Sequence, residues 1–342
     1  MHTRTESHFT RVARVFAVAA TLAAGTAVAE PSVIKVATIA PKGSIYHRVL
    51  QEMGEAYQRA TKPGARFVIY PNSIQGTEAD TVRRMRVGQL HASMLTVVGL
   101  TQIDRSVAAL QFMPMMFRSW DELDYVREKL RPDLEAKLAA KGFVVLIWGE
   151  AGWVQFFTKE DIATPEEYRQ SRIFAWSGDM VQASVMKSQG FRPVSIPLSD
   201  ILPALETGMI DTVPVAPLWA LIGQFDRVTR YMLRVNWVPI VGATVMRRQT
   251  YEAMSPEARA ALRTAAEQAT QKLRSHRERQ DEESIEAMKA RGLTVKPLTP
   301  ELEQAWRAIA EKAWPHVRGN MVPAETFDKV RMLLESYRKG KP

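Results

Sequence analysis

Hydrophobic and polar positions near the start of the chain alternate between the spacing of strands and the spacing of helices. Apolar residues alternate along short strand-like runs and recur at helical spacing between them, and Gly88 ends the second helical stretch. Strands that alternate with helices in this way are typical of parallel βαβ units. We therefore predict strands over residues 34–38, 67–70 and 91–98, and helices over residues 46–60 and 77–87.

The middle of the chain continues this pattern with shorter elements. Residues 143–148 are consecutively apolar, which is typical of a strand buried on both faces. Residues 164–167 read Thr-Pro-Glu-Glu, a capping box with proline at the first helical position, and predict a short helix. Further short strands are predicted over residues 173–176 and 193–196, and Asp200 is expected to begin the next helix.

The longest predicted helix occupies residues 255–291. Its apolar stripe stops in the charged and polar segment 274–283 and resumes at Ile285. At 1.5 Å per residue, about 36 residues span ~54 Å, which is longer than one small domain. We therefore predict that this helix packs against two domains and that its charged middle segment is solvated between the two contacts.

Residues 1–29 have the features of a signal peptide. Arg4, Arg11 and Arg14 precede an apolar, alanine-rich run, and Ala27-Val28-Ala29 supplies a small-x-small cleavage site before Glu30. The alternative is an uncleaved membrane anchor, but the apolar run is shorter than the ~20 residues of a spanning helix. We expect cleavage and a periplasmic location.

The composition narrows the possible partners and chemistry. The formal net charge is +9, but basic residues are interleaved with acidic ones, as in residues 277–283, whereas a nucleic-acid site would present a clustered basic face. The chain has no cysteine, which excludes disulfides and thiolate metal sites. Its histidines stand without metal-ligand spacing, and hydrolase, P-loop and dinucleotide-binding motifs are absent. We expect a non-catalytic protein with no cofactor, no metal and no nucleic-acid partner.

Five segments, in order along the chain, carry a resemblance to a known family. They are residues 36–47 (VATIAPKGSIYH), 70–88 (YPNSIQGTEADTVRRMRVG), 110–117 (LQFMPMMF), 148–153 (WGEAGW) and 164–211. Together they resemble the DctP-type solute-binding proteins, which are the extracytoplasmic receptors of TRAP transporters. The resemblance implies a periplasmic-binding-protein-like α/β fold, in which two lobes joined by a hinge close on a ligand and a long helix bridges the lobes.

The resemblance also implies a division of the chain. The first lobe would comprise residues 30–151 and about 240–273, and the second lobe residues 152–239 and about 280–342. The long helix over residues 255–291 would connect them.

One position departs from the family's usual pattern. Where the family typically places the arginine that clamps a substrate carboxylate, this chain has Phe174. Other aligned cleft positions are also aliphatic where polar or aromatic residues are usual, and a carboxylate without a partner there would lose several kcal/mol. Two of the four tryptophans at residues 148, 153, 176 and 219 are expected in the core. Glu150 is the best remaining candidate for a polar residue of the cleft. The candidate substrate-binding residues are Thr96, Glu150, Trp153, Val154, Phe174, Trp176, Leu198, Val215 and Trp219.

These residues lead to a hypothesis and two alternatives. The hypothesis is a receptor that delivers a hydrophobic or amphipathic small molecule to TRAP membrane subunits. Because it lacks this arginine, the chain resembles a branch of the family that works with a periplasmic tetratricopeptide-repeat protein. The resemblance suggests such a protein as a further partner. One alternative is an ordinary organic-acid receptor, in which another residue, such as Arg172, holds the carboxylate of the ligand. The other is a periplasmic carrier or sensor subunit that passes a lipid-like ligand to a different partner.

Overall fold

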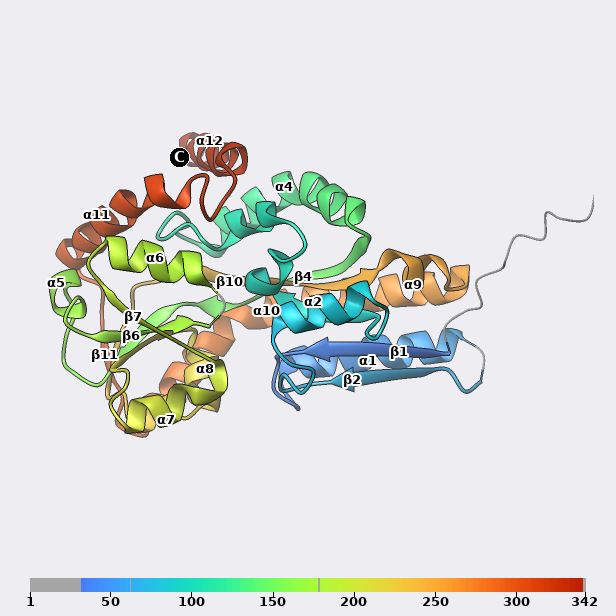
Figure 1. The fold of residues 1–342 in the computed structure, drawn as a ribbon, viewed down its shortest axis with the longest axis horizontal. Helices are drawn as coiled ribbons and strands as arrows, with labels where there is room; N and C mark the ends of the chain where they lie inside the picture. Colours follow the sequence, from blue (N-terminus) through green and yellow to red (C-terminus); the bar gives the residue numbers. More distant parts are fainter. Residues whose placement is uncertain (1–31, 62, 178, 341–342) are drawn as a thin grey trace, which may run out of the picture.

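Two mixed β-sheets, each covered by helices, lie side by side along the long axis of the molecule (Figure 1). The computed structural model describes residues 32–61, 63–177 and 179–340, so the expected signal peptide lies outside the described residues. The expected two-lobed α/β architecture is confirmed. We call the five-stranded sheet with its helices the first lobe, and the six-stranded sheet with its helices the second lobe.

The first lobe is built on a sheet of order β2-β1-β3-β10-β4. Strand β1 pairs in parallel with β2 and β3, whereas β10 runs antiparallel to both of its neighbours. The strands are β1 (Val33–Thr38), β2 (Arg66–Tyr70), β3 (Ala92–Thr96), β4 (Phe143–Trp153) and β10 (Pro239–Arg247). The helices are α1 (Ile45–Ala60), α2 (Glu78–Arg86), α3 (Val97–Leu100), the 3-10 helix η1 (Arg105–Leu110), α4 (Trp120–Ala140) and α9 (Arg248–Glu252).

The second lobe is built on a sheet of order β11-β9-β5-β8-β6-β7. Its strands are β5 (Gln155–Thr158), β6 (Arg172–Trp176), β7 (Arg192–Ile196), β8 (Thr212–Val215), β9 (Tyr231–Leu233) and β11 (Thr294–Lys296). Its helices are α5 (Pro165–Tyr168), α6 (Met180–Ser188), the 3-10 helix η2 (Leu198–Asp200), α7 (Ile201–Glu206), α8 (Pro217–Ile222), the 3-10 helix η3 (Phe225–Arg227) and α11 (Pro300–Val317).

Local sequence signals account for where several elements begin. Thr77 and Thr164 form complete capping boxes at the starts of α2 and α5. The third strand is shorter than the expected 91–98, because the Thr96 hydroxyl accepts a hydrogen bond from the Val98 amide and starts α3. The fourth strand is longer than the expected 143–148 and reaches Trp153 at the boundary between the lobes.

Two backbone connections between the lobes run beside each other. Strand β4 passes into β5 through Val154, and β9 passes into β10 through Trp237 and Val238. The Val154 amide donates to the Val238 carbonyl, and the Trp237 amide donates to the Val154 carbonyl, each at 2.9 Å. These hydrogen bonds tie the two connections into a short paired segment between the lobes.

The long helix α10 (Pro256–Lys289) packs against both lobes, as expected. Its first half contributes Leu262, Ala266 and Leu273 to a core shared with α1 and β1. Near its other end, Ile285 and Met288 lie in the core of the second lobe. Ser255 caps its start by accepting a hydrogen bond from the Ala258 amide.

The prediction that the middle of α10 is largely solvated is wrong for one face of the helix. Arg277, Gln280 and Asp281 are buried, whereas Arg274, Arg279 and Glu283 are exposed. The Arg277 guanidinium contacts both carboxylate oxygens of Asp124 at 2.8 and 3.0 Å and a carboxylate oxygen of Glu150 at 3.3 Å. This face of the charged segment is buried because α4 and β4 supply these partners, so its polar character does not by itself indicate solvent exposure.

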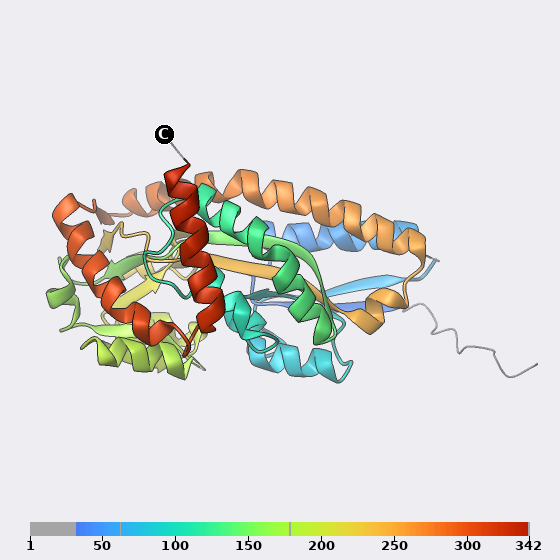
Figure 2. The same cartoon turned by 90° about the horizontal axis from the view of Figure 1, so that it is seen from above.

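The C-terminal helix α12 (Ala324–Lys339) returns to the first lobe. It lies across α4 in Figure 2 and contributes Phe327, Val330 and Leu334 to the same core as Leu123 and Leu130 of α4. The expected division assigned residues 280–342 to the second lobe, and the structure differs from it here. The apolar stripe of α12 gives no information about which lobe it covers, so the sequence could not assign it.

Burial of Asp281 predicts a pH-dependent stability. Burial raises the pKa of Asp281 from 3.8 to about 7, although the Trp153 amide donates to its carboxylate at 3.0 Å. The folded protein therefore favours the protonated acid. The contribution of this proton to the free energy of unfolding is complete below about pH 4 and is lost as the pH rises through about 7. Asp281→Asn should raise the free energy of unfolding by about 2–4 kcal/mol at pH 8, as measured by urea denaturation.

The same substitution should give little or no gain at pH 5, where the native acid is already largely protonated. Glu283→Gln, at a nearby exposed position of the same helix, is the matched control and should show no such difference between the two pH values. An equal effect of Asp281→Asn at both pH values would contradict the assignment of a raised pKa.

Candidate functional site

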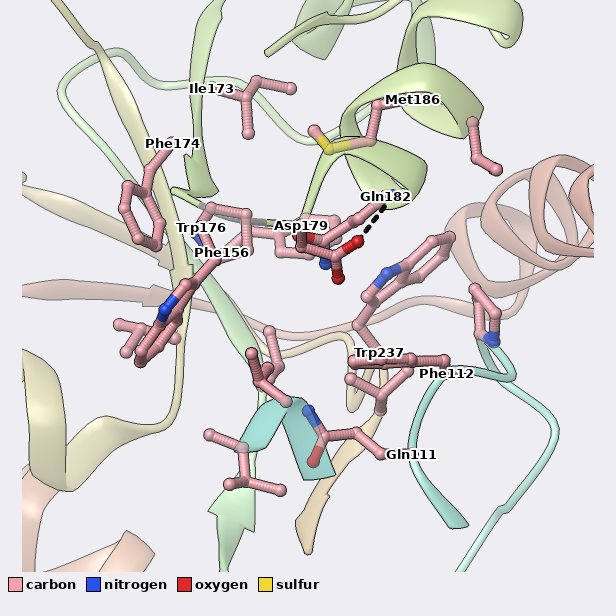
Figure 3. A pocket seen from close by; sticks show the side chains of 18 of the residues that line it. Gln111, Phe112, Phe156, Ile173, Phe174, Trp176, Asp179, Gln182, Met186 and Trp237 are labelled. Carbon is pink, nitrogen blue, oxygen red and sulfur yellow. Dashed lines mark hydrogen bonds between the residues drawn. The ribbon is translucent and has the colours of Figure 1, made fainter. Parts of the chain in front are cut away.

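A cavity of about 210 Å³ lies between the two lobes, with walls from both (Figure 3). The first lobe contributes Thr96, Gln111 and Phe112, and the second lobe contributes strands β5, β6 and β8 and helix α6. Most of the wall is apolar, and much of it is aromatic. The aromatic lining residues are Phe112, Phe156, Tyr168, Phe174, Trp176, Phe191, Trp219, Trp237 and Trp306.

Strand β6 presents two aromatic residues to this cavity. Side chains at alternate positions of a strand lie on the same face, so Phe174 and Trp176 share one face of β6. Their ring centroids are 6.3 Å apart and both rings lie on the cavity wall (Figure 3). Phe174 also packs into the core of the second lobe and is 5% exposed, so the ring is firmly held.

The structure brings most of the predicted site residues together. The members that line the cavity are Thr96, Val154, Phe174, Trp176, Leu198, Val215 and Trp219. Trp153 lies elsewhere, because it packs against Trp120 in the core of the first lobe, with the two rings tilted and their centroids 4.9 Å apart. Of the four tryptophans considered, Trp176 and Trp219 therefore line the cavity, while Trp148 and Trp153 are core residues.

Glu150 also lies outside the cavity, contrary to the expectation that it is a polar residue of the cleft. It is 4% exposed and forms ion pairs with Arg127 and Arg277. Arg127 is also 3.0 Å from Asp124, so two arginines and two carboxylates form one buried cluster. The carboxylate of Glu150 pairs with these arginines and so links β4 to α4 and α10.

The sequence did not predict the aromatic cluster around Trp306. The Trp306 ring lies 5.0 Å from Phe156, 5.2 Å from Tyr168 and 5.8 Å from Trp237, between ring centroids. Its indole nitrogen donates to the Ala163 carbonyl at 2.8 Å. Nothing in the helical pattern of α11 indicates that it approaches the cavity. For Phe156, alternation along β5 with Val154 was an available signal.

Polar groups on the wall are few and mostly occupied. The Thr96 amide and hydroxyl donate to the two oxygens of Glu78 at 2.6 and 2.7 Å, and burial raises the pKa of that carboxyl. Gln111 accepts from the Val241 amide at 3.0 Å. The Tyr168 hydroxyl is buried and has no hydrogen-bond partner within the described part of the chain.

Asp179 is the acidic residue of the wall, and it was not among the predicted site residues. It caps α6, where its Oδ1 accepts a hydrogen bond from the Gln182 amide at 2.9 Å (Figure 3). Burial raises the pKa of Asp179, and hydrogen bonds from the Gln182 and Val181 amides oppose that shift. Its position just after a predicted strand was a usable signal, because ligands bind at the carboxyl ends of parallel strands.

Arg172, the residue considered for holding a carboxylate, does not line the cavity. Its guanidinium makes two hydrogen bonds to Asp211 at 2.8 and 2.7 Å, and its side chain is half exposed. Among the described residues that line the cavity, none is arginine, lysine or histidine. The geometry therefore provides no basic side chain to pair with an acidic ligand.

Fold and cavity together define a class of protein, namely two-lobed binding proteins that hold a small molecule between their lobes. The chain belongs to the DctP family, described as bacterial extracellular solute-binding protein, family 7, whose pattern matches residues 36–320. Proteins of this family are periplasmic receptors that bind small solutes and work with TRAP membrane subunits, and they are not enzymes. No helix in the described ranges is long and apolar enough to cross a membrane.

Curated relatives with similar sequences cover most of the chain. The C4-dicarboxylate-binding periplasmic protein DctP of Rhodobacter capsulatus is 23% identical over 311 residues, which are 89% of this chain and 92% of the relative. The 2,3-diketo-L-gulonate-binding periplasmic protein YiaO of Escherichia coli is 23% identical over 256 residues, or 73% of this chain and 76% of the relative.

Solved structures share the fold at lower identity. A TRAP periplasmic solute binding protein from Desulfovibrio desulfuricans, with bound sn-glycerol-3-phosphate, has a TM-score of 0.81 at 17% identity and covers 91% of this chain and 98% of its own. One from Chromohalobacter salexigens, with bound D-glucuronate, has a TM-score of 0.80 at 17% identity and covers 89% and 99%.

Proposed function

We propose that this receptor captures a hydrophobic or amphipathic small molecule, rather than an organic acid, for TRAP-type uptake. The observation that carries the proposal is the composition of the cavity wall. Aromatic and aliphatic side chains from both lobes surround the space, and no described arginine, lysine or histidine lines it. The resemblance to the family aligns Phe174 with the arginine that usually clamps a carboxylate, and the ring of Phe174 lies on this wall.

The physical balance favours an apolar ligand. Each Å² of apolar ligand surface removed from water contributes about 25 cal/mol, so ~200 Å² contributes roughly 5 kcal/mol before the costs of association. An ionised carboxylate that enters the same space without a partner loses several kcal/mol of hydration. The ligands named for the relatives and solved structures, such as C4-dicarboxylate and D-glucuronate, are acids and would meet that penalty here.

The proposed function also implies the partners of this receptor. TRAP membrane subunits would receive the ligand. The phenylalanine at residue 174 supports a periplasmic tetratricopeptide-repeat protein as an additional partner, through the resemblance to the branch that uses one. The cleaved signal peptide over residues 1–29 belongs to this proposal as well.

The proposal predicts a retained ligand of low polarity. Protein purified gently from the periplasm should carry a bound small molecule in native mass spectrometry, and extraction into an organic solvent should release it. Unfolding the protein in acid should free the same mass. Recovery of a dicarboxylate or a sugar acid as the bound species would contradict the proposal and favour the ordinary organic-acid receptor.

A further inference from the structure

The wall of the cavity carries a single carboxyl group. Asp179 is the one aspartate, glutamate, lysine, arginine or histidine among the described residues that line the cavity. Its carboxylate points into the space ringed by the labelled side chains in Figure 3, which include Trp176 and Trp237. Arg169, a nearby basic residue, is committed to Glu166 at 2.9 Å and to the Gln189 carbonyl at 3.1 Å.

A purely structural role explains only part of this arrangement. Asp179 caps α6, and aspartate is a favourable capping residue. A hydroxyl side chain would supply the same hydrogen bond without placing a charge among aromatic rings. Hydroxyl residues cap other helices of this chain in that way, at Ser44, Thr77, Ser119, Thr164, Ser255 and Thr299.

We propose that Asp179 recognises the protonated amine of an amphipathic ligand whose apolar body lies against the aromatic wall. This inference rests on the proposed function and specifies the ligand class of the same cavity. An ammonium group is attracted to a carboxylate and to the faces of aromatic rings, particularly tryptophan. The cavity offers both, because Asp179 and a wall of indole and phenyl rings share one space.

The hydroxyl of Tyr168 gives independent support for a ligand with a polar atom. Tyr168 lines the same cavity, and its buried hydroxyl has no partner in the described structure. A buried polar group left unpaired costs about 1–3 kcal/mol, and a ligand N–H that donates to its oxygen would relieve part of that cost. A hydrocarbon ligand would leave this hydroxyl unpaired and would bring no opposite charge to the carboxylate of Asp179.

Probes with one chain length and different heads test the inference. Binding of n-octylamine, n-octanol and n-octanoate is measured by isothermal titration calorimetry at pH 7.5, where the first is a cation and the last an anion. We expect n-octylamine to bind about tenfold more tightly than n-octanol, and n-octanoate to bind most weakly.

Asp179→Asn removes the charge and keeps a good helix cap. It should weaken n-octylamine binding about tenfold while leaving n-octanol nearly unchanged. Asp104→Asn is the matched control, because Asp104 caps η1 through the Ser106 amide at 2.9 Å and lies outside the cavity. It should leave the affinities of all three probes unchanged.

The outcomes separate this inference from the proposed function. If n-octanol binds but the amine has no advantage, or if Asp179→Asn retains the advantage, the inference is overturned and the apolar receptor stands. If n-octanoate binds most tightly, both are overturned in favour of an acid receptor. If none of the three probes binds, the apolar cavity is not the ligand site and both proposals fail. The comparison of the three probes on the unaltered protein decides the matter even if the variant is unstable.

Discussion

Phe174→Arg is expected to weaken binding of an apolar probe such as n-octanol by about a hundredfold, because a guanidinium would have to enter a space walled by aromatic rings. The ring of Phe174 is part of that wall and is 5% exposed, so the longer charged side chain cannot be accommodated without displacing neighbours or the ligand. It would also compete with an amine for Asp179. Calorimetry with n-octanol measures the loss directly.

Met209→Arg is the control for this substitution. It introduces the same charge in the second lobe at a position that is 53% exposed and outside the cavity, so n-octanol affinity should not change. Tighter binding of C4-dicarboxylates or sugar acids by the Phe174→Arg protein would be compatible with the proposal, since the substitution introduces a basic residue into the cavity wall. Tighter binding of the natural retained ligand would show that this ligand is itself an acid.

Arg277→Met is expected to destabilise the protein by about 3–5 kcal/mol, because it leaves buried carboxylates short of a partner. Arg277 pairs with both Asp124 and Glu150, and its guanidinium lies 4.7 Å above the ring centroid of Trp120. Burial raises the pKa of Asp124, but the hydrogen bond from Arg277 and the charges of Arg127 and Arg277 outweigh it and hold the pKa at about 2. Urea denaturation at pH 7 measures the loss.

Arg274→Met provides the comparison on the same helix and the same carboxylate. Arg274 also pairs with Asp124, but its side chain is 53% exposed, and exposed ion pairs contribute only about 0–1 kcal/mol. A small difference between the two variants would mean that the cluster is well hydrated in solution. The contrast therefore tests the burial of the network rather than the mere presence of ion pairs.

Much of the fold could be predicted from the chain, because its signals are local. Thr77, Thr164 and Ser255 begin helices where their side chains cap them, and alternation placed Phe174 and Trp176 on one face of a strand. The family resemblance then supplied the arrangement of the lobes, which spacing alone does not give.

The errors have a common physical cause, since they concern partners far apart in sequence. The middle of α10 reads as a solvated segment because Arg277 is separated from Asp124 by 153 residues and from Glu150 by 127 residues. Glu150 reads as a free carboxylate of the cleft for the same reason. Trp306 reads as an ordinary helix residue, since only the folded chain brings α11 beside β5 and α5.

The return of α12 to the first lobe has a consequence for the order in which the chain can fold. The sheet of this lobe needs β10 between β3 and β4, and its helical layer needs Phe327, Val330 and Leu334 from the last helix. A growing chain that has emerged only as far as β4 therefore has an open sheet and an uncovered apolar face on α4. The N-terminal lobe cannot complete its core before the C-terminus is available. Folding of the first lobe therefore waits for the last helix of the chain.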